Sequence, residues 1–166
     1  MIAINTRKMS RYEIIKKIKT YFSIQELVGK ETFDKYGQRS FKFLSTDILE
    51  TLLILRESTG KKITVNSWKW GGNFSQRGLR TNLQGIFKSK TNNGRLYLSA
   101  HVLGKAFDLD VDGMTAPEVR IWIKENQSLF PHKIRLERNM GTDPINWVHI
   151  DTMNEEQNPH VYEFDV

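Results

Sequence analysis

Hydrophobic and polar positions alternate most cleanly in residues 105–111. In a β-strand this alternation separates two faces, because successive side chains point to opposite sides. The apolar face would consist of Phe107, Leu109 and Val111, and the acidic face of Ala106, Asp108 and Asp110. A small alanine beside an inward-pointing carboxylate leaves room for a metal ion. His101, seven positions before Asp108, is a candidate second ligand.

Three segments have the hydrophobic spacing of amphipathic helices. Residues 46–57 are the clearest, with an apolar stripe, an acidic residue in the first turn and a glycine after the end. Residues 11–20 and 115–127 each begin with a capping box, in which a Ser or Thr is followed by a Glu three positions later. Residues 23–27 resemble the start of a further helix.

The remaining pattern predicts strands and loops. Strands are expected at residues 62–66, 133–137 and 145–151, and the last two would form a hairpin. Residues 29–45 have no clear period and are predicted to be an ordered surface segment. Residues 67–98 are predicted to be a long loop region, and loops of such length are usually functional. This order of elements predicts an α+β fold, with helices packed on one face of a mainly antiparallel sheet.

Composition narrows the candidate chemistry. The 166 residues fit a single domain, and the absence of cysteine excludes disulfides and thiolate metal ligands. The four histidines are His101, His132, His149 and His160. We expect His132, beside a turn proline, and His160, in the C-terminal tail, to be surface residues. Any zinc site must be held by histidine and carboxylate side chains, and the small number of histidines limits the candidates.

The chain is basic, with a formal net charge of +6 and a pI of about 9.5. Nucleic acid, anionic lipid and bacterial cell-wall polymer would all suit this charge, as would a merely solubilising surface, since the Lys and Arg residues are scattered along the sequence. No stretch approaches the about 20 apolar residues of a membrane span. The N-terminus lacks the apolar core of a signal peptide, so we expect cytoplasmic synthesis.

A third metal ligand is available near the C-terminal end of the sequence. His149 lies on the last predicted strand, on the same face as Asp151. Together with His101 and Asp108 it would supply two imidazoles and one carboxylate, a common composition of catalytic zinc sites that keep a fourth position open for water. Purely structural roles for these histidines remain the alternative at this point.

Two segments resemble the signature of a known family. They are Ser99-x-His101-x-x-Gly104-x-Ala106-x-Asp108 and Trp147-Val-His149-Ile-Asp151. The first is similar, at every anchor position, to the signature of zinc D-alanyl-D-alanine-type metallopeptidases, and the second resembles their strand that carries the third ligand. Residues 21–27 and 76–80 are similar to a compact subgroup common in phage and prophage sequences. The resemblance covers most of residues 21–152.

The resemblance implies a hedgehog/DD-peptidase fold for a single domain of residues 1–166. Residues 1–20 would form an N-terminal helical extension, residues 21–152 the peptidase core and residues 153–166 a C-terminal tail. It also implies a monomer that binds Zn²⁺ and hydrolyses peptidoglycan stem peptides, as a D,D-carboxypeptidase or an L-Ala-D-Glu-type endopeptidase. Such an enzyme would be a phage endolysin released by a holin-type pore, or a phage component, with no nucleic-acid or membrane partner.

The sequence departs from the family at the catalytic base. Many relatives have an acidic residue two or three positions before the last histidine, where this chain has Asn146 and Trp147. The nearby carboxylates are Glu137, Asp143 and Asp151. Similarity to an Arg-x-Glu strand of the phage subgroup favours Glu137 as the base, and Asp151 is expected to orient a ligand.

A cation is also implied, to stabilise the oxyanion or to hold a substrate carboxylate. Arg77 and Arg80 are the candidates, with a slight preference for Arg77. If no carboxylate reached the metal, the alternative would be a zinc-stabilised, non-catalytic module that binds the cell wall or belongs to a virion.

Overall fold

The computed structural model describes residues 8–141 and 143–166, and it has an α+β architecture. In the described residues the α-helices are α1 Arg11–Tyr21, α2 Lys30–Tyr36, α3 Thr46–Thr59, α4 Gly85–Thr91 and α5 Ala116–Glu125. Short 3₁₀ segments are η1 Ile24–Glu26, η2 Gly37–Phe43, η3 Trp68–Trp70, η4 Asn92–Gly94 and η5 Gln127–Leu129. The strands are β1 Ile63–Thr64, β2 Ala106–Val111, β3 Ile134–Met140, β4 Asp143–Asp151 and β5 Val161–Asp165.

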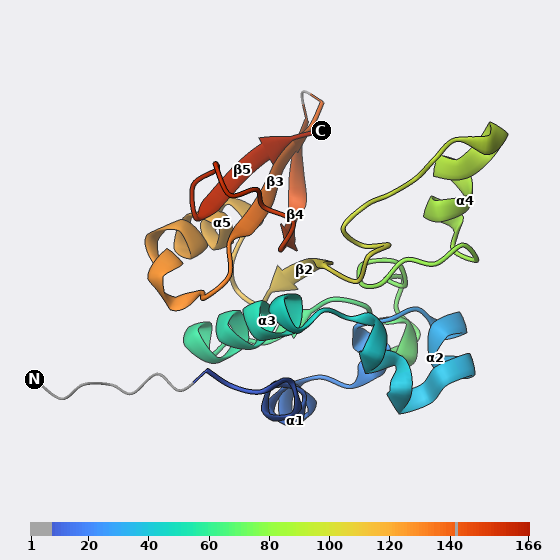
Figure 1. Ribbon diagram of the computed structural model, residues 1–166, viewed down its shortest axis with the longest axis horizontal. Coiled ribbons are helices and arrows are strands. Elements are labelled where there is room, and N and C mark those ends of the chain that lie inside the picture. The colour runs from blue at the N-terminus through green and yellow to red at the C-terminus, as the bar shows by residue number, and fades with distance from the viewer. Residues whose placement is uncertain (1–7, 142) are drawn as a thin grey trace, which may run out of the picture.

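The strands form one mixed sheet in the order β1-β2-β4-β3-β5. β1 with β2, β2 with β4 and β3 with β4 are antiparallel, and the predicted hairpin is the β3–β4 pair. β5 is parallel to β3 and forms the edge, so the segment expected to be a tail belongs to the sheet. In Figure 1, α1 and α3 lie below the sheet, and α4 stands apart to the right.

The alternation of β2 divides the molecule into a core side and an open side. Phe107 and Leu109 are fully buried in one hydrophobic core with the leucines of α3, and α5 contacts β2 and β4. The opposite face of the sheet carries Asp108 and lines a cleft. The helices that share this core therefore leave the acidic face of β2 free for chemistry.

α1 belongs to the same core. It begins with the predicted capping box, in which Ser10 and Glu13 bond each other's backbone N–H groups. Ile14 and Ile18 are fully buried, and α1 packs against α3. Residues 11–20, set apart in the sequence as an extension, thus contribute to the packing of the domain.

The two segments without clear periodicity contain short helices that the sequence pattern does not predict. Residues 29–45 contain α2 and η2, and residues 67–98 contain α4 together with two 3₁₀ segments. α2 and α4 each have seven residues, about two turns. So short a helix repeats its buried positions too few times to produce a recognisable period.

The two remaining histidines make side-chain contacts within the domain. The His132 Nε2 atom lies 2.7 Å from a carboxylate oxygen of Glu50, a buried residue of α3. His160 Nε2–H donates to the Phe130 carbonyl at 2.8 Å. Both side chains remain partly exposed, as expected for surface residues, but each makes a defined contact near the start of β3. Among the described residues, no helix has the length and apolar character to cross a bilayer.

Gly104 closes the turn before β2 and has a positive φ of +66°. A Cβ atom there would overlap the Phe43 carbonyl oxygen. Gly104→Ala is expected to lower the free energy of unfolding by about 3 kcal/mol, because the left-handed backbone and the overlap both oppose a side chain.

Gly60 is the matched control, since its φ is +65° but no atom lies within 4 Å of its Cβ position. Gly60→Ala should cost only about 1 kcal/mol. Chemical denaturation would compare the two, and equal losses would contradict the packing argument.

Candidate metal centre

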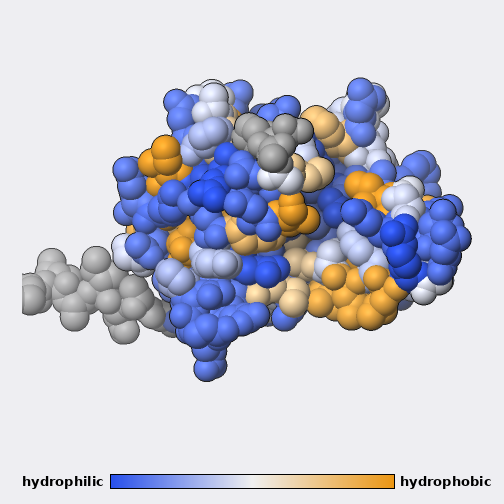
Figure 2. Space-filling model, turned by 90° about the horizontal axis from the view of Figure 1, so that it is seen from above, coloured by the Kyte–Doolittle hydropathy of each residue, from blue (hydrophilic) through white to orange (hydrophobic). Residues whose placement is uncertain are grey.

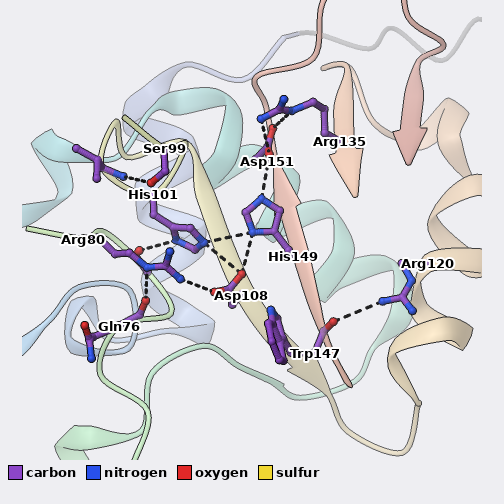
Figure 3. Close-up of polar contacts among 12 residues, drawn as sticks. Gln76, Arg80, Ser99, His101, Asp108, Arg120, Arg135, Trp147, His149 and Asp151 are labelled. Atoms are coloured by element: carbon purple, nitrogen blue, oxygen red, sulfur yellow. Dashed lines mark hydrogen bonds and ion pairs between the residues drawn. The ribbon is translucent and has the colours of Figure 1, made fainter. Parts of the chain in front are cut away.

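Three donor atoms from distant parts of the chain meet at one point. His101 Nε2 lies 3.2 Å from Asp108 Oδ1 and 3.2 Å from His149 Nδ1, and the last two atoms are 2.8 Å apart. The three side chains point toward one another (Figure 3), and the three residues are only 2–7% exposed. Zinc bonds of about 2.0–2.2 Å at tetrahedral angles would place two donors about 3.3 Å apart. The triangle is close to this size, so His101, Asp108 and His149 could hold a metal ion.

The backbone places each donor. Asp108 on β2 lies directly opposite His149 on β4, so the two side chains share one face of the sheet. His101 belongs to the turn that leads into β2, where Gly104 N–H donates to the His101 carbonyl at 3.2 Å. The positive φ of Gly104 therefore helps to return the chain from His101 to β2.

The segment 76–80 provides the wall behind His101. Gly78 lies so close to the Leu27 carbonyl that a Cβ atom would overlap it. The Gly78 carbonyl accepts a hydrogen bond from His101 Nδ1 at 2.8 Å, which leaves Nε2 directed at the metal position. Asp108 N–H donates to the Arg77 carbonyl at 2.7 Å. Backbone contacts thus hold this segment against two of the three ligands.

Outer partners fix the other two ligands in the same way. His149 Nε2–H donates to Asp151 at 2.9 Å, which directs Nδ1 at the metal position. Asp151 is fully buried and accepts two hydrogen bonds from the guanidinium of Arg135, at 2.9 and 3.0 Å. The second oxygen of Asp108 accepts from Arg80 at 2.8 Å. Contacts of this kind orient metal ligands and raise their affinity for the ion.

The electrostatics of the site favour ionised carboxylates. Burial by itself raises the pKa of Asp108 and of Asp151, but the neighbouring imidazoles, and Arg135 at Asp151, lower both pKa values below their ordinary range. Burial lowers the pKa of His101. Burial also opposes protonation of His149, yet its hydrogen bonds to the two aspartates raise its pKa to about 9. The two buried carboxylates therefore form a site that attracts positive charge.

Glu137 is the carboxylate at this site that has no partner among the described residues. It lies on β3 directly opposite His149, which places it on the same face as the donor triangle. It lines the cleft, and its carboxylate makes no hydrogen bond or ion pair within the described residues. Burial raises the pKa of Glu137 above its ordinary value. The side chain of Asp143, the other hairpin candidate, lies outside the described residues.

The two candidate arginines have different surroundings. Arg80 is held on three sides, by the Gln76 carbonyl, the Tyr97 hydroxyl and Asp108. Arg77 pairs with Asp110 and lies over the ring of Phe74, 3.5 Å from its centroid. Both arginines line the cleft. Arg80 therefore touches a candidate metal ligand, whereas Arg77 touches the next acidic side chain along β2.

The donor triangle opens into a cleft of about 940 Å³. One wall comes from residues 73–101, and the other comes from β3, β4 and β5. Figure 2, which views the molecule from above, shows the surface between the sheet and the end of the molecule that carries α4. The volume is within the usual range for ligand pockets, so the cleft can admit a substrate of several residues.

Two residues of the site were missed in the sequence. Arg135 shares a strand face with Glu137, and the two-residue spacing could have revealed it. Phe164 lies opposite Glu137 on β5, with its ring 6.0 Å from that of His149. Its place depends on parallel pairing between segments 27 residues apart, for which the sequence carries no local signal.

Comparisons with known proteins identify no relative of this chain. No protein-family model matches the chain, and no curated protein or solved structure shows a significant match to it. The contacts of the cleft residues are therefore the basis for its chemistry.

Proposed function

We propose that the protein is a zinc-dependent peptidase with a hedgehog/DD-peptidase-type fold. The observation that carries the proposal is the buried donor triangle at an open cleft, with the carboxylate of Glu137, which has no partner among the described residues, on the adjacent strand. Structural zinc sites are usually closed by four protein ligands. Among the described residues only three metal-ligating side chains form this group, which leaves a position for water.

Two imidazole nitrogens and one carboxylate oxygen suit zinc. When bound, zinc would polarise the scissile carbonyl and lower the pKa of a bound water toward about 7. Glu137 accepts the proton of the attacking water and passes it to the departing amine nitrogen. Its raised pKa suits both steps, because the group must first gain the proton and then release it.

The remaining polar residues of the site bind the substrate or position the metal ligands. Arg77 retains guanidinium N–H groups for the carbonyl oxygen or a carboxylate of the substrate, because its hydrogen bond to Asp110 uses one nitrogen. Arg80 holds the second oxygen of Asp108, and Arg135 with Asp151 holds His149. Arg80, Arg135 and Asp151 are positioning residues, since they act on the metal ligands Asp108 and His149.

Peptidoglycan stem peptides are the substrate we propose, cleaved by a D,D-carboxypeptidase or an L-Ala-D-Glu-type endopeptidase activity. This part of the proposal rests on the similarity of the two signature segments to the zinc D-alanyl-D-alanine-type metallopeptidases. A net charge of +6 also suits an anionic wall. The similarity of residues 21–27 and 76–80 to phage sequences supports a role in phage lysis.

Digestion of muropeptides with and without a chelator tests the proposal, together with the metal content of the purified protein. We expect about one zinc ion per chain, as a single open site requires. New peptide termini should form and should disappear with the chelator, and their identity would reveal the bond that is cut. Zinc without cleavage of any wall type would instead support the non-catalytic module, and absence of bound metal would refute the proposed site.

A further inference from the structure

Acidic and basic residues are distributed unevenly along the chain. Residues 58–107 contain nine of the 25 Lys and Arg residues and none of the 19 Asp and Glu residues. This segment therefore carries a formal charge of +9, and the rest of the chain carries −3. The positive charge of this segment thus comes mainly from its lack of acidic residues, and residues 73–101 within it form one wall of the cleft.

Within this segment, residues 82–98 form an arm built around α4. The arm projects from the body on the right of Figure 1. Its base is held by Glu31, which accepts hydrogen bonds from Gln84 at 2.7 Å and from Thr81 at 3.0 Å. Lys88, Lys90 and Arg95 of the arm are exposed.

The arm also exposes large aliphatic side chains. Leu83, Leu96 and Leu98 are 60%, 84% and 67% exposed. Tyr97, between two of them, turns inward, where its ring contacts Phe87 and its hydroxyl accepts from Arg80. Hydrophobic residues lie beside hydrophilic ones at this end of the molecule in Figure 2. Three leucines at such exposure, on the same short arm as three exposed cations, favour a binding surface.

We propose that the arm binds the surface of a lipid bilayer that contains anionic headgroups. Its cations would contact the phosphates, and its leucines would enter the boundary between headgroups and acyl chains. This surface is distinct from the donor triangle, so the inference goes beyond the proposed peptidase function and does not depend on it.

The exposed aliphatic residues favour a bilayer over other anionic partners of the arm. Nucleic acids and anionic wall polymers would attract the lysines and Arg95, but they offer no apolar phase for Leu83 and Leu96. Single-stranded nucleic acid is bound mainly through aromatic rings on which bases stack. The aromatic rings of the arm, those of Phe87 and Tyr97, are half-buried and contact each other edge to face, so the most exposed side chains of the arm are aliphatic and cationic.

Co-sedimentation of the full chain with vesicles tests the proposal. Vesicles of phosphatidylglycerol and phosphatidylcholine should bind the protein at least about tenfold more tightly than pure phosphatidylcholine, and added salt should weaken this binding. Lys88→Gln/Arg95→Gln and Leu83→Ser/Leu96→Ser should each weaken binding about tenfold or more. None of these four residues lines the main cleft.

Matched variants elsewhere on the surface provide the controls. Lys16→Gln/Lys19→Gln on α1 removes the same charge, and Ile121→Ser/Leu129→Ser removes two other exposed aliphatic side chains. Both should bind vesicles within about twofold of the unchanged chain, and thermal unfolding should show that all four variants are folded. Equal losses in the control variants would overturn the proposal, as would failure to bind anionic vesicles. Loss only in the charge variant, with duplex DNA competing fully, would assign the arm to a nucleic acid and also overturn it.

Discussion

Replacing His101 by alanine is expected to abolish both stoichiometric metal binding and peptide-bond hydrolysis. The variant removes one of the three donors and leaves Asp108 and His149 facing each other. Loss of an outer partner of a metal ligand typically costs 10- to 100-fold in affinity or activity, and loss of a ligand itself should exceed about 100-fold. Metal analysis of the purified variant and muropeptide digestion would measure the two losses.

His160→Gln is the matched control for this variant. His160 is half-buried and donates to a backbone carbonyl, but it is not one of the residues that line the cleft. It should keep the metal and the activity. A His101→Ala protein that is free of metal yet fully active would refute the metal mechanism.

Glu137→Gln should reduce kcat at least about 100-fold while the protein keeps its metal. Glutamine has nearly the same shape as glutamate but cannot accept the proton of the attacking water. Glu137 is not part of the donor triangle, so metal affinity should change little. Turnover of a purified muropeptide and metal content, measured on the same preparation, separate catalysis from metal binding.

Asp143→Asn provides the comparison for Glu137→Gln. The sequence places both carboxylates on the β3–β4 hairpin, and only Glu137 lies opposite His149. We expect Asp143→Asn to retain turnover. The reverse result, with turnover lost in Asp143→Asn and kept in Glu137→Gln, would transfer the role of base to Asp143.

Much of the fold could be predicted from the sequence where a pattern repeats. The two faces of β2 and the capped starts of α1 and α5 follow from alternation and from side-chain hydrogen bonds to the backbone. α2 and α4 were missed because they are too short to show a period. β5 was missed as a strand because its pairing with β3 is parallel and crosses a long connection.

The same contrast holds for the candidate site. His101, Asp108 and His149 were predicted from spacing and from the two signature segments, and they meet in the structure. The carbonyl of Gly78 could not be found in this way, because any residue has a carbonyl and only the fold brings this one to His101. The different surroundings of Arg77 and Arg80 likewise depend on how the loop crosses β2.

The row of Asp108, His149 and Glu137 across three neighbouring strands links chemistry to folding. A shift of β4 by one residue would turn His149 toward the hydrophobic core and bring Val148 or Ile150 to the cleft. Tight metal binding would therefore report that β2 and β4 have paired in the native register. A metal that binds only this state would also stabilise it in proportion to its affinity and concentration. The bound ion would thus stabilise the native pairing of β2 with β4. The supply of metal would then influence how much of the protein reaches its native state.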